Sequence, residues 1–491
     1  MGCKVALGDI CSFSRGASVP RARMFDKGDF LYIHYGDLYK GFNLRIDVEN
    51  PAKPIPYISG DEKIKDSQRL CDQDIVYVLT SETVDDLGHA YLFNNPLDRP
   101  AVSGTETTVV RVERRDLIVP AYLNYLMSTP RFVSCLRQYV RGMKVFRVHP
   151  DDVARIEIEL PPVDVQKQVV AILDAFYEKQ RVNARLNGYL LELAKARLSN
   201  LTYKENPLGM VSVGSFAATM TNGSTPSRKK PDYWEGGSIP WVKTGEVNNN
   251  LLFKTNEHIT ELALAETSVH LLPKNTVVMA LYGSGTAGRL AILQEKATTN
   301  QACTAMVCRT PSQAFYLFLT LQGMYREIDS KTRGSVQQNL SKDIVASLMI
   351  PAVTEDLLDE IRLCDIYDQV RANEYESLQL ASLRDALLPK LMSGEIDVSK
   401  IDPTQLNSHL AECVQKIKGG AIESNLTLYS SKHPTVVKLL IRCSKMVLGI
   451  IQSHPVGLFT NTFDGVLEGP VKLLDTGFHL VKHDLILVHG H

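Results

Sequence analysis

The amino-acid sequence consists of two similar halves, and this internal repeat constrains the fold more than any other feature. The segment Val5–Pro20 returns as Val211–Pro226, at an offset of 206 residues (211 − 5). The segment Pro161–Ala196 returns as Pro351–Ala386, at an offset of 190 residues (351 − 161). Solenoid repeats have periods of roughly 20–50 residues, so this period is too long for one. The sequence therefore predicts two copies of one domain-plus-helix unit.

Each copy begins with a region that reads as a mixed α/β domain. Short runs rich in β-branched and aromatic residues, such as Asp74–Leu79 and Thr276–Leu281, predict strands between turn signals. We place the first domain at residues 1–160 and the second at residues 204–350. The expected fold class is α+β, with the two domains separated by two long helices.

The helical segments follow the domains, at residues 161–203 and 351–402. Their apolar residues are spaced by threes and fours and form a narrow seam, which predicts two helices that pair as an antiparallel coiled coil. The first helix would be about 55 Å long at ~1.5 Å per residue. The seam comprises Val169, Ile172, Phe176, Asn183, Leu190 and Leu193 in the first helix and Ile366, Val370, Asn373, Leu380, Leu383 and Leu387 in the second; Leu186 shares the spacing.

Two asparagines, Asn183 and Asn373, occupy equivalent seam positions. A polar residue within such a seam fixes the register of the helices at some cost in stability. The alternative is that both asparagines face water.

The composition is that of an ordinary globular protein. Of the 491 residues, 44% are hydrophobic and 22% charged, and the formal net charge is −1. This charge excludes a basic coat over the whole surface but leaves room for local basic patches. The nine cysteines show no metal-ligand or disulfide spacing, and no signal peptide or membrane span is recognisable. We therefore expect a cytoplasmic protein with reduced thiols and no membrane partner.

A glycine-rich segment, Gly283–Gly288, formally matches the GxGxxG pattern of dinucleotide sites. Such a site requires a helix to begin at the third glycine. The residues that follow, Arg289–Leu293, read instead as a strand. A hairpin turn is therefore the favoured interpretation, and a nucleotide-binding enzyme is the alternative, which requires a helix after Gly288.

No Walker A sequence, HExxH pair, GxSxG elbow or paired metal-ligand cluster is present. The sequence accordingly predicts a binding protein with no catalytic residue and no metal site. Arginine and lysine instead recur around two turns of each copy, where they would neutralise DNA phosphates, while nearby amides would read bases. The alternatives are solvated charges and amides that cap turns. The candidates are Arg15, Arg21, Arg141, Lys144, Arg147, Thr225, Arg228, Lys243, Thr244, Arg289, Asn300, Gln301, Arg333, Gln337 and Gln338.

Several short motifs, taken in order, resemble the DNA-specificity subunit of type I restriction–modification systems. The resemblance covers residues 1 to about 402 and is fuller in the second half. It rests on Gly223–Pro226, Ile239–Glu246, Gly285–Ile292, Thr299–Gln301, Arg333–Leu340 and Leu387–Ile396, and in the first half on Leu160–Gln168.

The resemblance implies that each domain is a target-recognition domain for one part of a bipartite, asymmetric site on double-stranded DNA. The helices would act as a spacer and would dock two methyltransferase subunits in a prokaryotic cytoplasm. S-adenosylmethionine would belong to those subunits, and ATP and Mg to restriction and translocase subunits, so this chain would bind no cofactor. A coiled-coil scaffold that does not read DNA is the alternative.

The C-terminal extension, residues 403–491, departs from the family pattern. It contains seven of the twelve histidines and has no counterpart in the first half. The histidines show no consistent ligand spacing, so we predict no metal site there. The sequence leaves open whether this segment is an appended module or the product of a gene rearrangement.

Overall fold

A computed structural model describes residues 3–38, 42–51, 53–204, 208–283, 285–333 and 340–398. The chain divides into two compact units, Met1–Pro389 and Lys390–His491. Both domains and nearly all of the two long helices belong to the first unit. The C-terminal extension, with its histidines, lies outside the described residues.

The first domain is built on a five-stranded sheet and a three-stranded sheet. Strands in the larger sheet pair antiparallel, except for the parallel edge pair β4–β8. A two-stranded ribbon, β1 with β12, joins the beginning of the domain to its end. The strands are, in sheet order, β2 (Cys11–Arg15), β10 (Thr107–Val112), β6 (Ile75–Val78), β8 (Ala90–Asn94) and β4 (Arg45–Asp47); β5 (Tyr57–Ile58), β3 (Phe30–Ile33) and β9 (Ala101–Ser103); β1 (Cys3–Ala6) and β12 (Glu157–Leu160); and β7 (Thr80–Ser81) with β11 (Phe146–Arg147).

The second domain repeats this topology, which confirms the predicted duplication. Its sheets have the same order and the same parallel pairs, and the ribbon β13–β22 corresponds to β1–β12. The strands are β14 (Thr219–Asn222), β21 (Cys303–Val307), β18 (Val277–Ala280), β19 (Leu290–Leu293) and β16 (Asn250–Leu252); β17 (Glu257–Ile259), β15 (Ile239–Val242) and β20 (Thr298–Thr299); and β13 (Met210–Ser212) with β22 (Met349–Pro351).

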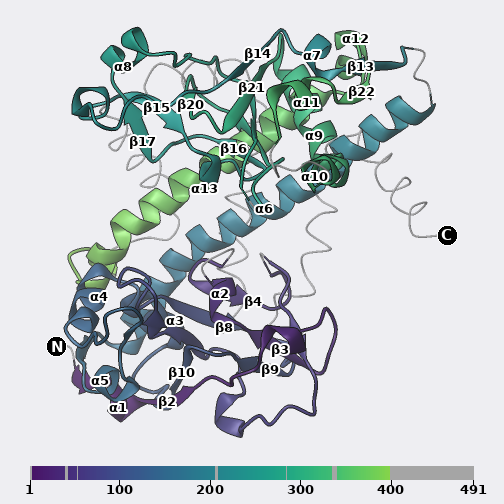
Figure 1. The fold of residues 1–491 in the computed structure, drawn as a ribbon. Coiled ribbons are helices and arrows are strands. Elements are labelled where there is room, and N and C mark those ends of the chain that lie inside the picture. The colour runs from purple at the N-terminus through teal and green to yellow at the C-terminus, as the bar shows by residue number, and fades with distance from the viewer. Residues whose placement is uncertain are drawn as a thin grey trace. The chain divides into compact units, whose positions relative to one another are not determined.

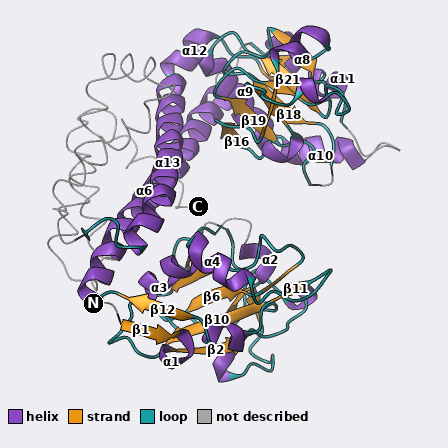
Figure 2. Ribbon diagram, turned by 90° about the vertical axis from the view of Figure 1, so that its left-hand side faces the viewer, coloured by secondary structure: helices purple, strands orange, loops and turns teal. Residues whose placement is uncertain are grey.

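Short helices cover the sheets of both domains (Figures 1 and 2). In the first domain they are α1 (Leu7–Ile10), α2 (Tyr35–Leu38), α3 (Pro120–Met127), α4 (Pro130–Arg137) and α5 (Pro150–Ala154). In the second they are α7 (Val213–Phe216), α8 (Glu261–Glu266), α9 (Pro311–Gly323), α10 (Tyr325–Arg333) and α11 (Lys342–Ala346). Single 3-10 turns, η1 (Arg21–Arg23), η2 (Asp66–Gln68), η3 (Pro231–Tyr233) and η4 (Thr244–Glu246), occupy the loops.

The central strands are buried on both faces. In β18, Val277 and Met279 belong to a core shared with α9 and the long helices, while Val278 and Ala280 belong to a second core toward β15. Because successive side chains of a strand point to opposite faces, the five-stranded sheet is the middle layer of three. This placement leaves the loops at the ends of the strands free to carry function.

Two long helices pair antiparallel. They are α6 (Val163–Lys204) and α13 (Leu363–Met392), and Figure 1 shows them side by side. The Gln180 side-chain amide donates to the Ser377 carbonyl (2.8 Å), and the Asn187 side-chain amide donates to the Val370 carbonyl (3.2 Å). Contact positions therefore fall along α13 as they rise along α6, and the predicted antiparallel pairing is confirmed.

The paired asparagines are buried rather than facing water. Asn183 is 2% exposed and Asn373 is 1% exposed. The Asn373 side-chain amide donates to Asn187 Oδ1 (2.7 Å), and that of Asn183 donates to Glu376 Oε2 (2.8 Å). Asn187 thus joins the network, although the apolar pattern gave no sign of it.

The seam is buried along most of its length, with two differences from the predicted pattern. Leu186 is 39% exposed, because Asn183 and Asn187 take the inward positions of that turn. Near the end of α13, Leu388 is buried more deeply than Leu387. Val169, Ile172, Phe176, Ile366, Val370 and Leu383 are buried, and Leu190, Leu193 and Leu380 are partly buried.

The ends of α6 do not stand alone as a spacer but pack on the domains. The Gln166 side chain accepts from the Val119 amide (2.9 Å), and Asp174 accepts from the Tyr125 hydroxyl (2.7 Å) in the first domain. At the other end, Leu190 and Leu193 pack against the core of the second domain. Each end of the helix therefore gains burial from a domain as well as from α13.

A short helix, α12 (Glu355–Glu360), precedes α13, so the second helical segment is not continuous from its start. Arg362 has φ 55°, and its amide donates to the Asp359 carbonyl (2.8 Å). This left-handed residue ends α12 and turns the chain into α13.

Candidate nucleic-acid interface

In the second domain, three loops that carry candidate residues converge on one surface. The Ser224 amide donates to the Thr299 carbonyl (2.9 Å), and the Asn300 amide donates to the Val242 carbonyl (3.0 Å). The Thr225 hydroxyl donates to the Gln301 side-chain carbonyl. Parallel pairing of β15 with β20 produces this convergence, because both strands end at the same edge of the small sheet.

Lys243 and Thr244 lie directly after β15 at this edge. The Glu246 side chain accepts from the Lys243 amide (2.8 Å) and from the Asn256 amide (2.7 Å), which fixes the η4 turn. Arg289 lies on a neighbouring loop and donates to Asn248 Oδ1 (3.0 Å). The structure thus brings together Thr225, Arg228, Lys243, Thr244, Arg289, Asn300 and Gln301, which we call the second-domain cluster.

Arg228 of the second-domain cluster is held against two tryptophan rings. Its guanidinium lies 3.6 Å from the centre of the Trp234 ring and 5.0 Å from that of Trp241. The indole N–H of Trp241 donates to the Ser224 carbonyl (3.0 Å), which ties the aromatic seat to the turn. A guanidinium stacked on indole faces keeps its edge N–H groups for an outside acceptor.

A carboxylate, Glu257, bridges two cations of this cluster. It lies 2.5 Å from Arg228 Nη2 and 2.6 Å from Lys243 Nζ. The hydrogen bond from Lys243, followed by that from Arg228, holds the pKa of the Glu257 carboxyl below its usual value. The glutamate is therefore ionised at neutral pH.

The first domain contains an equivalent turn, with a correction to the sequence alignment. The Ala17 amide donates to the Ser103 carbonyl (2.7 Å), as the Ser224 amide does to Thr299. Ala17 therefore corresponds to Ser224, an offset of 207 (224 − 17). The offset of 206 predicted for Val5–Pro20, which would match Ser18 to Ser224, is wrong by one residue at this turn. One extra residue between α7 and the turn explains the difference. Arg21 consequently corresponds to Arg228.

Arg21 is exposed on η1 and lies 3.9 Å from the Asp37 carboxylate. Its neighbour Arg23 donates to both carboxylate oxygens of Glu62 (3.2 and 3.3 Å). Burial, and then the charge of Arg21, lowers the pKa of His34, which keeps this imidazole neutral at pH 7. Arg21, like Arg228, thus presents a cation beside the turn.

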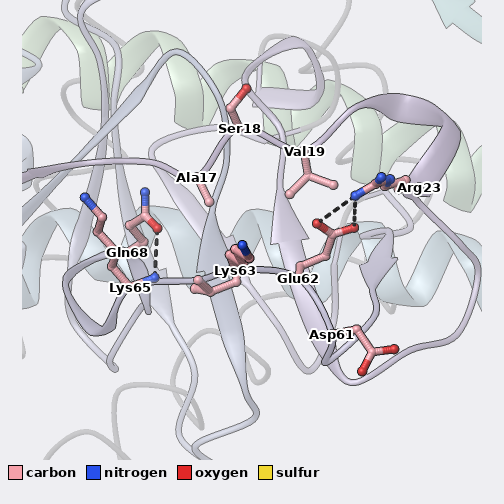
Figure 3. Close-up of a pocket in the computed structure, with 10 residues that line it drawn as sticks. Ala17, Ser18, Val19, Arg23, Asp61, Glu62, Lys63, Lys65 and Gln68 are labelled. Atoms are coloured by element: carbon pink, nitrogen blue, oxygen red, sulfur yellow. Dashed lines mark hydrogen bonds and ion pairs between the residues drawn. The ribbon is translucent and has the colours of Figure 1, made fainter.

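A hollow of about 370 Å³ lies beside the first-domain turn (Figure 3). The turn residues Ala17, Ser18 and Val19 form one side, and the segment 61–68 forms the other, with Lys63 and Lys65 on it. Sequence reasoning missed this segment, because it lies in the connection between β5 and β6 and carries no motif. The alternation Lys63-Ile-Lys65 in an otherwise acidic stretch is a sequence signal that could have indicated a basic surface here.

A second basic group of the first domain lies on a hairpin. The backbones of Arg141 and Arg147 exchange two hydrogen bonds (2.9 and 2.8 Å), and Lys144 lies exposed near the tip. Arg141 pairs with Asp152 (3.1 Å), and Arg147 lies 3.9 Å from Glu106. Because Glu106 follows the Ser103 strand end, the hairpin reaches the turn described above.

Arg15 connects the two basic groups of the first domain, which together we call the first-domain cluster. It ends β2, immediately before the turn, and its guanidinium lies 3.2 Å from His149 Nε2. The members of the first-domain cluster that sequence analysis named are Arg15, Arg21, Arg141, Lys144 and Arg147.

The counterpart of this hairpin in the second domain lies largely beyond the described residues. Gln337 and Gln338 fall in the gap at 334–339, and Arg333 is the last residue of α10, described in its backbone only. The predicted roles of these three residues stay predictions.

The glycine-rich segment is a hairpin turn. The strand β19 begins at Leu290, directly after it, and pairs antiparallel with β18. The Gly288 amide donates to the Ala280 carbonyl (2.8 Å), and Gly288 has φ 83°. A nucleotide site requires a helix here, so the nucleotide-binding alternative is wrong.

Metal-binding groups, membrane-spanning helices and reactive thiols are three other features that would indicate a function. Within residues 3–398, gaps excepted, no group of three or more His, Cys, Asp and Glu side chains is arranged to hold a metal ion. Among the helices of the same described part, none has the length and apolar character needed to cross a bilayer. Burial raises the pKa of Cys11, Cys303 and Cys308 to about 12, so these three thiols stay protonated.

Comparison with known proteins places these domains in a family. A family model described as the type I restriction modification DNA specificity domain matches residues 3–190 and 208–356. The specificity subunit of type I restriction enzyme EcoR124I/EcoR124II of Escherichia coli is 27% identical over 212 residues, which are 42% of this chain and 51% of that protein. The MjaIX specificity subunit of Methanocaldococcus jannaschii is 21% identical over 338 residues, 64% of this chain and 76% of that protein.

The chain thus spans about half the length of the Escherichia coli relative in their match. Among solved structures, the type I S subunit from M. genitalium has a TM-score of 0.48 at 13% identity, covering 80% of this chain and 96% of that one. The HsdS subunit from Thermoanaerobacter tengcongensis has a TM-score of 0.31 at 17% identity, covering 80% and 97%. With two family matches that together span more than half of its residues, the chain belongs to the type I restriction modification DNA specificity family.

Proposed function

We propose that this chain is the non-catalytic specificity subunit of a type I restriction–modification assembly, and that each domain reads one part of a bipartite, asymmetric DNA site. The observation that carries the proposal is the recurrence of one turn, with a cation at its edge, in both domains. Arg21 and Arg228 hold equivalent places beside it, and the same backbone hydrogen bonds build both turns. The domains differ in the side chains around the turn, which supports two different half-sites.

The cations and the amides take different roles in this proposal. Arg228 and Lys243, with Arg141, Lys144 and Arg147 in the first domain, bind phosphates and set the orientation of the duplex. Asn300 and Gln301 carry side-chain amides of the kind that pairs bidentately with adenine. Gln301 receives the Thr225 hydroxyl hydrogen bond, which orients its amide before DNA arrives.

The helices separate the two half-sites and dock two methyltransferase subunits, with restriction and translocase subunits joining the assembly. Large apolar side chains on the outer surface support docking: Leu186 is 39% exposed, Tyr189 50% and Leu378 44%. Exposed apolar groups that cluster on a surface mark protein interfaces. S-adenosylmethionine, ATP and Mg belong to the partner subunits, in a prokaryotic cytoplasm.

The test is to co-express the chain with the methyltransferase subunit encoded beside it and to map modified adenines across host DNA. We expect an asymmetric bipartite motif that disappears when this chain is omitted. Thr225→Ala with Gln301→Ala should relax the motif in one half only, whereas Lys229→Ala, an exposed neighbour, should leave it unchanged. A complex that forms but adds no methylation contradicts DNA reading, and failure to form any complex contradicts the docking role.

The scaffold alternative makes a different prediction about salt. If the domains bind protein rather than DNA, neutralising Arg141, Lys144, Arg228 and Arg333 leaves the salt dependence of binding unchanged. Under the proposed function, each lost phosphate contact instead reduces the slope of log K against log salt by about 0.9. Duplex binding measured at several salt concentrations separates the two.

A further inference from the structure

The Glu257 carboxylate lies between the two cations, Arg228 and Lys243, to which the proposed function assigns phosphate binding. It contacts Arg228 and Lys243 at 2.5 and 2.6 Å, and its side chain is 28% exposed. Both cations are more open to solvent, at 52% and 38%. An acceptor that already pairs with both cations competes with any phosphate that approaches them.

Arg228 has a second support besides Glu257. The guanidinium is seated on Trp234 and Trp241, whose rings meet edge to face with centroids 5.0 Å apart. Trp241 in turn is 3% exposed and anchored to the turn by its indole N–H. The aromatic seat therefore positions the cation, while the glutamate adds a negative charge beside it.

The first domain has no carboxylate at the equivalent position. Trp241 pairs with Glu257 across the β15–β17 ladder. The matching residue of β3 is Tyr32, and its amide donates to the Pro56 carbonyl (2.8 Å), so Pro56 stands where the second domain has Glu257. The first domain brings a carboxylate to Arg21 from another element, since Asp37 of α2 lies 3.9 Å from Arg21 and also pairs with Lys53. A carboxylate on the strand that faces Trp241 is thus a property of the second domain.

We propose that Glu257 is a specificity-determining residue of the second domain, which suppresses binding to DNA of the wrong sequence. The inference rests on the proposed function. To bind phosphates, Arg228 and Lys243 must give up part of their pairing with Glu257, and the remaining negative charge repels the backbone. Phosphate contacts, which a duplex of any sequence offers, offset this cost only in part. An unrelated duplex is held by phosphate contacts alone and therefore bears the whole cost. In the correct half-site, base contacts hold the duplex and fewer phosphates need to displace Glu257, so the glutamate widens the difference in affinity between right and wrong sequences.

The test compares Glu257→Gln with Glu295→Gln in the full-length chain. Both substitutions remove one negative charge from the same domain, but Glu295 is exposed and lies outside the second-domain cluster. The probe is a fluorescently labelled duplex of unrelated sequence, with binding measured over a range of salt concentrations. A second duplex carries the site identified by methylation mapping.

We expect Glu257→Gln to raise affinity for the unrelated duplex by roughly threefold to tenfold, the range set by two freed surface ion pairs. The salt slope should steepen by about 1 to 2, since one or two more phosphates become neutralised. Affinity for the correct site should rise less, so the ratio of specific to non-specific binding falls. Glu295→Gln should match the wild-type chain.

Three results would contradict either the role of Glu257 or the proposed function on which it rests. Equal affinity of the two variants for the unrelated duplex overturns the role of Glu257, as does weaker binding by Glu257→Gln with an unchanged melting temperature. If Glu257→Gln shifts the melting temperature, Glu257→Ala and Glu257→Asp are compared as well. Glu257→Ala, which removes the charge, should show the same rise in non-specific affinity, and Glu257→Asp, which keeps the charge, should not. If the wild-type chain binds no duplex in a salt-dependent manner, the proposed function fails instead.

Discussion

At the scale of single residues, Glu374 carries a carboxyl group that burial makes harder to ionise. It lies on α13 against the β16 backbone, and burial raises the pKa of its carboxyl to about 7. A hydrogen bond from the backbone at Leu251 opposes this shift but does not cancel it. The folded protein therefore holds a proton here that the unfolded chain releases between about pH 4.5 and 7.

This proton makes stability depend on pH. In that interval the folded state binds more protons than the unfolded state, so the free energy of unfolding falls as pH rises and levels off above pH 7. The loss amounts to at most about 3 kcal/mol. We expect Glu374→Gln to raise the unfolding midpoint at pH 8 and to leave it nearly unchanged at pH 5. Thermal unfolding at both pH values measures this, and equal effects of the substitution at the two would contradict it.

Gly142 permits the hairpin of the first-domain cluster. It has φ 111°, and an added Cβ would collide with the Val145 carbonyl oxygen. We expect Gly142→Ala to distort the hairpin and lower duplex affinity about as much as losing one or two phosphate contacts.

Gly188→Ala is the control, because Gly188 lies on α6 and no atom lies near the position of an added Cβ. That change should raise the free energy of unfolding by about 0.5–1 kcal/mol and leave the affinity for duplex DNA unchanged. Unchanged duplex binding by Gly142→Ala would show that the hairpin does not contact DNA.

Residue-level prediction succeeded where a motif is local and failed where it depends on distant pairing. Gly288 could be assigned to a hairpin because the residues that follow it already read as a strand. The one-residue shift at Ser18 could not be seen, because motif matching does not reveal which carbonyl an amide contacts. Glu257 was missed for the same reason, since only the β15–β17 register brings it to Lys243.

At the scale of elements, the buried asparagines decide how α6 and α13 align. A slip of the helices by one turn would leave their amides without partners in an apolar seam, at a cost of about 1–3 kcal/mol for each buried group. The Lys179–Glu376 ion pair (3.0 Å) adds to the same registration. The heptad-like pattern alone predicted the pairing, but it could not distinguish buried asparagines from exposed ones.

A double-mutant cycle tests this registration. Asn187→Ala and Asn373→Ala should each lower the free energy of unfolding by about 1–3 kcal/mol, because each leaves a buried amide unpaired. The double substitution should cost less than the sum, since the two side chains share one hydrogen bond. Additive effects in denaturant unfolding would mean that the two asparagines act independently.

At the scale of the whole molecule, the proposed function makes the helix pair set the distance between two half-sites. Under the proposed function, seven residues inserted after Glu178 and seven more after Gln379 add about 10.5 Å to both helices on the same side of the asparagine network. We expect the gap between the half-sites to grow by about three base pairs, with both half-sites unchanged. Adenine methylation mapping measures both quantities. A changed half-site, or an unchanged gap, would show that the helices do not set the spacing.

The ribbons β1–β12 and β13–β22 have a consequence for how such a chain can change through inheritance. Each ribbon pairs the first strand of a domain with its last, so each domain begins and ends at one place. Two genetic crossovers, one in each strand of a ribbon, would exchange everything between them and leave the helices untouched. Under the proposed function, a lineage could in this way acquire a new half-site in a single recombination event, while the other half-site and the spacing stay as they were.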